Sequence, residues 1–304
     1  MKAQVYVENY MWPIWVTLLL AVAFVLVAFR LNQTRDLGEG IIPARPGRKD
    51  ASRFLQGTFG LSVRLTRNIF IGWMVCMFLL GMSYGSVLGD LENFLLSNDF
   101  FKQFLNAGEG VPLIEQFVST IASIMAIVAA IPAVLILLKI RSEEKKGHNE
   151  NILARNVSKT KLLSGYFVIA VFSSIVMLLC VVFGLWSASF ATMAEPIPLA
   201  MMLKLGLVYL PAIWVMMGIT LVLISYLPRL TSIVWAYLGY AFFTVYLGRI
   251  LDLPGWVAKL SPFGHVPQIP VEEMNIVNLT VLTGIAVVLT IAGFVKYNKR
   301  EMMN

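Results

Sequence analysis

The side chains best suited to chemistry or to binding a soluble partner lie in the charged stretch of residues 141–161, which separates two long apolar segments. Glu143 and Glu144 are followed by Gly147 and Glu150, and then by Leu153 and a basic run. An acidic start followed by a basic end suits the dipole of a short helix. The alternative is a polar face that is only solvated.

No set of residues along the chain indicates a complete catalytic or metal-binding site. The sequence has no Gly-x-x-x-x-Gly-Lys-Ser/Thr phosphate loop and no His-Glu-x-x-His pair. His148 and His265 stand alone in different loops, and Cys76 and Cys180 lie within apolar segments, where a packing thiol is expected. We therefore predict that the chain is not itself an enzyme and binds no metal or cofactor.

The elements that position these residues must be membrane spans. Hydrophobic residues make up 58% of the 304 residues, charged residues only 13%, and the mean hydropathy is +0.77. A bilayer core of about 30 Å needs about 20 apolar residues per helical crossing. Because the apolar runs are continuous rather than alternating, we predict an all-α polytopic membrane protein. Its seven expected spans are 12–29, 69–88, 113–140, 164–188, 205–227, 231–247 and 276–295.

The distribution of positive charge predicts the orientation. Nineteen of the 24 lysine and arginine residues fall near 30–68, 139–161 and 229 and in the C-terminal tail. Since positive loops stay cytoplasmic, we expect a cytoplasmic C-terminus and an outside N-terminus in a bacterial plasma membrane. The net charge of +7 is explained by this asymmetry. Anionic membrane lipid, rather than nucleic acid, is therefore the expected partner of the basic loops.

A linker rich in proline and glycine, residues 36–48, divides the chain into a first span (1–50) and a six-span unit (51–304). Residues 51–67 predict either an amphipathic helix at the inner membrane surface or an irregular basic loop. Prolines and aromatic residues alternate over 249–275. This composition predicts either a re-entrant segment in the outer leaflet or a lid on the membrane surface.

No ionisable residue lies at the middle of a predicted span, so ion-coupled transport lacks an evident site and the energy for transport must come from elsewhere. Gly81, Gly85 and Gly89 form a stripe of small residues, suited to contact with another transporter half or to packing within one bundle. A substrate path without fixed charge would use apolar and aromatic groups. The candidates, each also explicable as ordinary packing, are Trp73, Tyr84, Met125, Tyr240, Phe243 and Tyr246.

Four sequence segments resemble one known family. The string that starts at Arg141 reads Arg-Ser-Glu-Glu-x-x-Gly-x-x-Glu-x-Ile-Leu-Ala-x-x-Val-Ser-Lys and lies between the second and third spans of the six-span unit. It resembles the coupling region of type-2 ABC exporter permeases. Residues 45–47 (Arg-Pro-Gly), 59–73 and 260–267 (Leu-Ser-Pro-Phe-Gly-His-Val-Pro) look like the polyketide-antibiotic (tetronasin-type) subgroup.

The resemblance implies the membrane subunit of an ATP-driven exporter of hydrophobic or amphipathic compounds such as antibiotics. In such a protein the loop, with Glu143, Glu144, Gly147, Glu150 and Leu153, would dock on a separate ATPase subunit that holds ATP and magnesium. The subgroup usually carries two six-span repeats, so we expect a C-terminal portion or a half-size permease that pairs with a second half or copy. Two alternatives are a non-transporting or sensor-associated membrane partner and an ATP-independent transporter.

Overall fold

The computed structural model describes residues 11–33, 52–90, 112–148, 157–193, 196–248, 251 and 253–300. These residues form helices and turns, with no strand among them, and divide into two compact units, Met1–Ala51 and Ser52–Asn304. The first unit contains one helix, α1 (Trp12–Gln33). Its 22 residues span about 33 Å, enough to cross a membrane, and none of its apolar span is buried within the protein.

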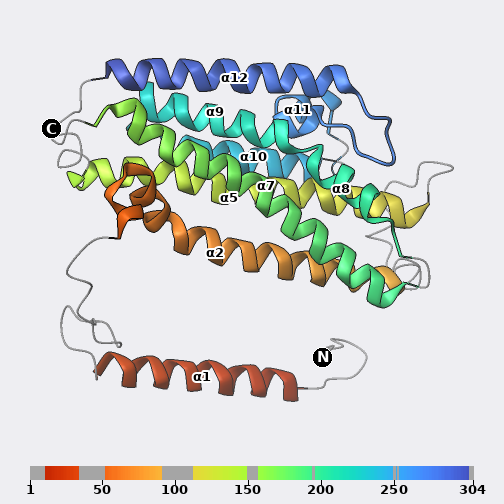
Figure 1. Ribbon diagram of the computed structural model, residues 1–304. Coiled ribbons are helices and arrows are strands. Elements are labelled where there is room, and N and C mark those ends of the chain that lie inside the picture. Colours follow the sequence, from red (N-terminus) through yellow and green to blue (C-terminus); the bar gives the residue numbers. More distant parts are fainter. Residues whose placement is uncertain are drawn as a thin grey trace. The chain divides into compact units, whose positions relative to one another are not determined.

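The second unit is a bundle whose long helices run side by side (Figure 1). Its helices are α2 (Thr58–Gly85), α5 (Leu113–Lys145), α7 (Lys159–Thr192), α8 (Leu199–Leu207), α9 (Leu210–Tyr226), α10 (Ile233–Tyr246), α11 (Gly255–Lys259) and α12 (Ile276–Lys299), with 3-10 turns η1 (Arg53–Gln56), η2 (Leu88–Asp90) and η3 (Pro262–His265).

The predicted all-α polytopic membrane protein is confirmed, with corrections to individual spans. Among the described residues, six helical segments are long and apolar enough to cross a membrane. The expected span 231–247 is instead a helix of 14 residues, about 21 Å long, which falls short of a bilayer core of about 30 Å. The expected span 205–227 begins earlier, at Leu199, and consists of α8 followed by α9. Pro211 accounts for the break, because its ring clashes with the carbonyl four residues earlier.

The second unit does not begin with a separate surface helix. Helix α2 begins at Thr58, eleven residues before the expected span, so residues 58–67 continue directly into the membrane helix. The preceding turn, η1, folds back on α2, and the rings of Phe54 and Phe59 meet edge to face with centroids 6.4 Å apart. Gly60 permits this return, since a Cβ there would collide with the carbonyl of Phe54.

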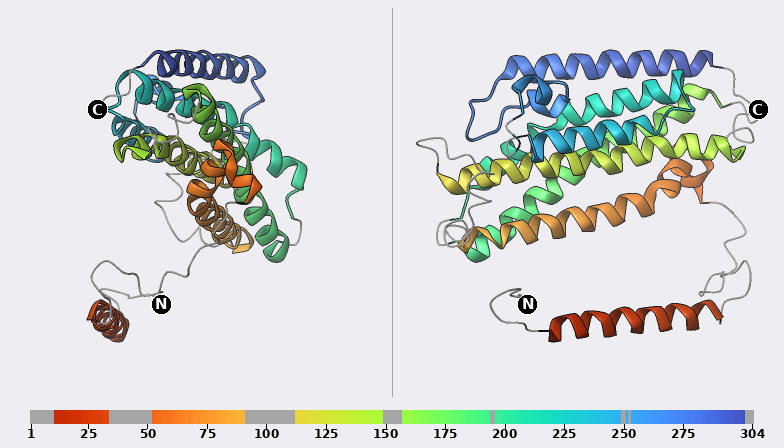
Figure 2. Two further views of the ribbon diagram at one scale, coloured as in Figure 1. Left: turned by 60° about the vertical axis from the view of Figure 1, so that its left-hand side comes forward. Right: turned by 180° about the vertical axis from the view of Figure 1, so that it is seen from behind.

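The core of the bundle lies around α5, whose apolar span is 78% buried, whereas α2 and α12 are each 17% buried and lie on its flanks (Figure 2). Helix α2 packs mainly on α7, and α12 mainly on α9. Gly81 and Gly85 face α7, where added Cβ atoms would lie 2.5 Å from the carbonyl oxygen of Val181 and 2.7 Å from that of Leu185. The predicted glycine stripe thus lies in a close helix contact within the chain, and Gly89 likewise approaches the carbonyl of Thr192.

The connection between α10 and α12 is packed against the bundle. Phe263 is 3% exposed and Val266 5%. The hydroxyl of Tyr237 donates to the carbonyl of Leu260 at 2.8 Å, and that of Tyr240 donates to the carbonyl of Val257 at 2.6 Å. These side chains satisfy backbone carbonyls in and just after α11, as a segment at membrane depth requires. Its re-entrant position stays a prediction.

Candidate functional site

A cluster of charged side chains closes the end of the bundle where α5 finishes. The Glu144 carboxylate, whose side chain is 5% exposed, pairs with Arg141 at 3.3 Å and with Arg300, the residue after α12. Arg300 also donates to the carbonyl of Ile224 in α9 at 2.6 Å, and Arg141 donates to that of Pro228 at 3.2 Å. Two guanidinium groups and one carboxylate therefore join α5, α9 and the end of α12.

Glu143 makes a second set of contacts at the same end. Its carboxylate lies 3.1 Å from the ammonium of Lys139 and 2.7 Å from Nδ1 of His148, and its side chain is 7% exposed. Lys159, the first residue of α7, donates from Nζ to the carbonyl oxygen of Arg300 at 2.5 Å. The cluster thus reaches the two helices that flank residues 146–158.

Burial sets the electrostatics of Arg300. Partial burial lowers the pKa of its guanidinium, and the positive charge of Arg141 lowers that pKa further. The ring of Tyr297, one turn earlier, lies 5.5 Å from the guanidinium carbon and adds a cation–π contact. Because two cations share one carboxylate, Glu144 is the residue on which the cluster depends most.

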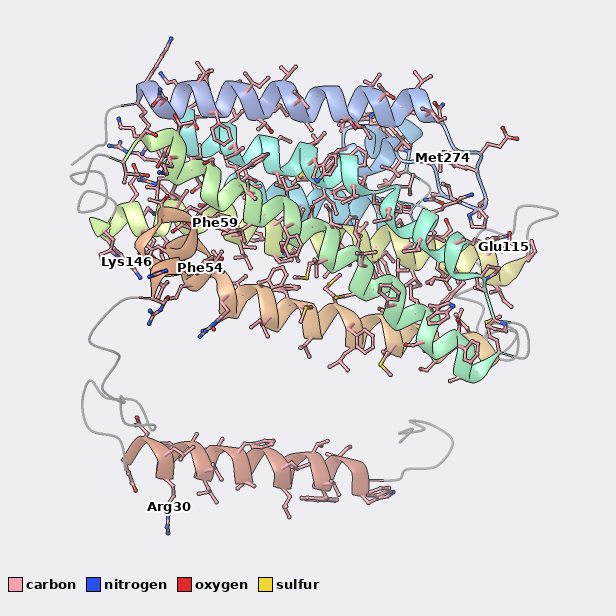
Figure 3. The ribbon with its side chains drawn as sticks, viewed as in Figure 1. Arg30, Phe54, Phe59, Glu115, Lys146 and Met274 are labelled. Atoms are coloured by element: carbon pink, nitrogen blue, oxygen red, sulfur yellow. The ribbon has the colours of Figure 1, made fainter. Side chains whose placement is uncertain are left out.

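The predicted coupling residues differ in their surroundings. Glu143 and Glu144 point into contacts within the chain, although the sequence places them on a charged loop. Gly147 adopts a φ of 72° just after the end of α5, a conformation that glycine accepts without steric cost. Lys145, Lys146 and His148 are exposed, and Figure 3 labels Lys146 at this end of the bundle. Glu150 and Leu153 lie outside the described residues.

The predicted substrate-path residues lie on three helices of the bundle, α2, α5 and α10. Trp73 and Tyr84 are half-buried on α2, and Met125 is 4% exposed on α5. On α10, the Tyr240 hydroxyl is used by Val257, Phe243 is 42% exposed, and Tyr246 stacks on Phe242 with centroids 5.5 Å apart. None of the six residues lines either of the two cavities described next.

Two cavities lie elsewhere in the second unit. A polar cavity of about 310 Å³, between α5, α10, α11 and η3, is lined by Ser123, Thr244, Gln268 and Glu272 among others. A mostly apolar cavity of about 390 Å³ lies where α5 begins, against the segment 196–198 and α8, with Glu115 in its lining. Both volumes fall within the range of small-molecule sites. The sequence did not predict that the hydroxyls of Ser123 and Thr244 line a cavity.

A polar stripe on α5 was also missed. Gln116, Ser119, Thr120 and Ser123 are each at most 5% exposed, although they occupy an otherwise apolar helix. Their spacing of three and four residues, which places them on one helical face, was visible in the sequence. The Ser119 hydroxyl has no hydrogen-bond partner among the described residues. Buried polar groups inside membrane bundles often mark functional positions.

One serine occurs in the spacing of a hydrolase nucleophile, since residues 81–85 read Gly-Met-Ser-Tyr-Gly. The nucleophile elbow requires a turn between a strand and a helix. Here the whole motif lies inside α2, and both glycines pack against α7. These residues therefore form a helix contact rather than a catalytic turn. Among the described ranges, no three His, Cys, Asp or Glu side chains gather as metal ligands.

The helical bundle, its membrane-length helices and its charged end define a polytopic α-helical membrane protein. Comparison with known proteins gives the family. The family model described as "Multidrug efflux system permease Rv1217c, C-terminal domain" matches residues 55–298, so the chain belongs to this family. The chain is also 29% identical over 307 aligned residues to the multidrug efflux system permease protein Rv1217c of Mycobacterium tuberculosis. That alignment covers 99% of this chain and 56% of the relative, so the chain spans about half the relative's length.

Proposed function

We propose that this chain is the membrane-spanning permease part of an ATP-driven exporter of small hydrophobic or amphipathic molecules, antibiotics among them. The observation that carries this proposal is the family match over residues 55–298, which lie within the second compact unit. The relative is described as a multidrug efflux system permease. The resemblance of residues 45–47, 59–73 and 260–267 to polyketide-antibiotic exporters supports the exporter permease.

Energy for export would come from a separate ATPase subunit that binds ATP and magnesium, because the sequence has no phosphate loop. We place its docking surface on the cytoplasmic side, at the end of the bundle where α5 ends and α7 begins. The charge cluster supports this placement, since it ties the base of the loop to α7, α9 and α12. Through these contacts, movement of the docked loop would be transmitted to helices that cross the membrane.

The second membrane half would come from another permease unit or from a second copy of this chain. The relative's greater length supports such pairing, because this chain covers only 56% of it. Glu143 and Glu144 would position the loop, and the exposed Lys145 and Lys146 would face the ATPase directly.

The test is reconstitution of the chain with a phosphate-loop ATPase encoded beside it. We expect the ATPase to copurify with the chain and its ATP hydrolysis to rise when a hydrophobic substrate is added. Reversal of two exposed charges, Lys145→Glu with Lys146→Glu, should remove this stimulation while the chain still inserts. Lys259→Glu, an exposed charge reversal at the other end of the bundle, is the matched control. Normal stimulation in the double variant would remove this surface from the interface, and no export by the complex would favour a non-transporting membrane partner.

A further inference from the structure

The apolar cavity at the beginning of α5 has walls that offer few hydrogen-bond donors. Four of its lining residues are prolines, Pro112, Pro196, Pro198 and Pro270, and a proline has no backbone N–H. Their rings also fix the backbone φ, so the wall is preformed. A ligand bound here gains apolar contact on several sides and meets few polar groups.

Two methionines complete the wall on the α8 side, Met201 and Met202, of which Met202 is fully buried. Unbranched thioether side chains adapt to ligands of different shapes and are polarisable. The volume of about 390 Å³ is sufficient for a compound with several rings or branches. The cavity therefore suits a bulky apolar body without demanding one particular shape.

Among the described residues of this lining, Glu115 is the only one with a charged side chain. It lies in the first turn of α5, at the end of the helix opposite to Lys146 (Figure 3). Among the described residues it forms no ion pair. A carboxylate beside an apolar wall attracts a cation more strongly than a carboxylate in open water does, because the local dielectric constant is lower.

We propose that this cavity binds a lipophilic organic cation, with its apolar body against the prolines and methionines and its charge beside Glu115. The inference deepens the proposed function, on which it rests for its biological meaning, by naming a substrate class and a place. The cation is a soluble compound with an ammonium or phosphonium group. A phospholipid with an ammonium headgroup offers the same chemistry and is separated from it by the experiment.

The experiment measures binding of tetraphenylphosphonium to the purified chain in dodecyl maltoside micelles, which contain no ammonium group. Tetraphenylborate has nearly the same size and shape but the opposite charge, so the ratio of the two affinities isolates the electrostatic contribution. Binding requires no ATPase subunit. A chain that binds the cation but exports nothing would therefore contradict the proposed function alone, whereas export without cation binding would contradict this inference alone.

We expect the wild-type chain to prefer the phosphonium. Glu115→Gln should weaken phosphonium binding about tenfold, equivalent to about 1.4 kcal/mol, and should strengthen borate binding, because the carboxylate no longer repels the anion. Glu115→Lys should reverse the preference. Glu273→Gln, an exposed carboxylate outside the lining, is the matched control and should change neither affinity. An unchanged thermal unfolding midpoint for each variant shows that the fold is retained.

Equal phosphonium affinity in wild type and Glu115→Gln would overturn the proposal, as would an equal loss in Glu273→Gln. Absence of any phosphonium binding to the wild-type chain would do the same. In a further arm, short-chain phosphatidylethanolamine is added to the micelles. Failure of the lipid to displace the phosphonium supports a soluble ligand, and full displacement at low lipid concentration would assign the site to a lipid headgroup instead.

Discussion

At the scale of single residues, Arg300 and Glu144 connect helices that are distant in the sequence. Helix α9 ends at Tyr226, so the carbonyl of Ile224 is among the last four, which have no partner within the helix. Arg300 satisfies this carbonyl and places its positive charge at the negative end of the helix dipole. Glu144 then balances part of the charge that Arg300 and Arg141 bring into this half-buried position.

Removal of the carboxylate should therefore harm the fold more than removal of one guanidinium. Glu144→Ala leaves Arg141 and Arg300 facing each other without an anion, and we expect a loss of about 3 kcal/mol of stability. Arg300→Ala should be milder, because Glu144 keeps Arg141, and the double variant should cost less than the sum. Thermal unfolding in detergent, followed by tryptophan fluorescence, ranks the stability losses of these variants. Glu273→Ala, which changes an exposed carboxylate, is the control. Equal midpoints for Glu144→Ala and Glu273→Ala would show that the cluster contributes nothing.

The sequence alone could place Glu143 and Glu144 at the end of a span but could not show which way their side chains point. Arg300 is 156 positions from Glu144 in the chain, and long-range ion pairs of this kind leave no periodic signal. By contrast, the partners Lys139 and Arg141 are predictable from their spacing of three and four residues to the two glutamates.

At the scale of elements, the contact of α2 with α7 depends on paired glycines. Gly81 and Gly184 face each other, and an added Cβ at Gly81 would lie 3.2 Å from Cα of Gly184. A Cβ at Gly184 would collide with the carbonyl of Phe78. Backbones this close gain dispersion contacts that larger side chains would prevent. The stripe at 81, 85 and 89 therefore packs on a helix of the same chain.

Gly184→Ala should consequently destabilise the bundle by about 1–3 kcal/mol, because backbone atoms at the contact cannot move aside cheaply. Gly72→Ala on α2 is the matched control, since a Cβ there meets open space within 4 Å. Alanine favours a helix over glycine, so this control should be neutral or slightly stabilising. Thermal unfolding midpoints of both variants in the same detergent show whether Gly184→Ala lowers the stability while Gly72→Ala does not. A midpoint for Gly184→Ala at or above that of Gly72→Ala would contradict the close contact.

The order of the apolar helices was predictable because lipid requires long continuous apolar runs, and these runs are visible without any knowledge of packing. Their number was less predictable, because the run 231–247 forms a helix too short to count among the six membrane-length segments of the described residues. Helix ends were less predictable. Helix α2 extends to Thr58 through Arg64 and Arg67, since polar residues continue a helix once it has left the apolar layer. Helix α10 is shorter than its apolar run suggests, and the two cavities arise only from how connections such as 196–198 fold back on the bundle.

At the scale of the whole second unit, Ser52–Asn304, the two ends of the bundle differ chemically. Helix α5 has 33 residues and a length of about 50 Å, so it extends beyond a bilayer core of about 30 Å. The ion-pair cluster and exposed lysines lie where α5 ends, and both cavities contain glutamate in their lining. This difference in charge is the one expected if the lysine-rich end faces the cytoplasm, as proposed.

Orientation can be tested with two exposed positions at opposite ends of the unit, Lys146 and Met274 (Figure 3). In a chain with Cys76 and Cys180 replaced, Met274→Cys should react with a membrane-impermeant maleimide in intact cells. Lys146→Cys should react only after the cells are permeabilised, because positively charged loops stay inside. Ser261 is unsuitable as an outer site despite its place in the same connection as Met274, since its side chain is 1% exposed and accepts a hydrogen bond from the amide of Phe263. Labelling of Lys146→Cys in sealed cells, with Met274→Cys protected, would invert the orientation and move the proposed ATPase surface to the other end of the bundle.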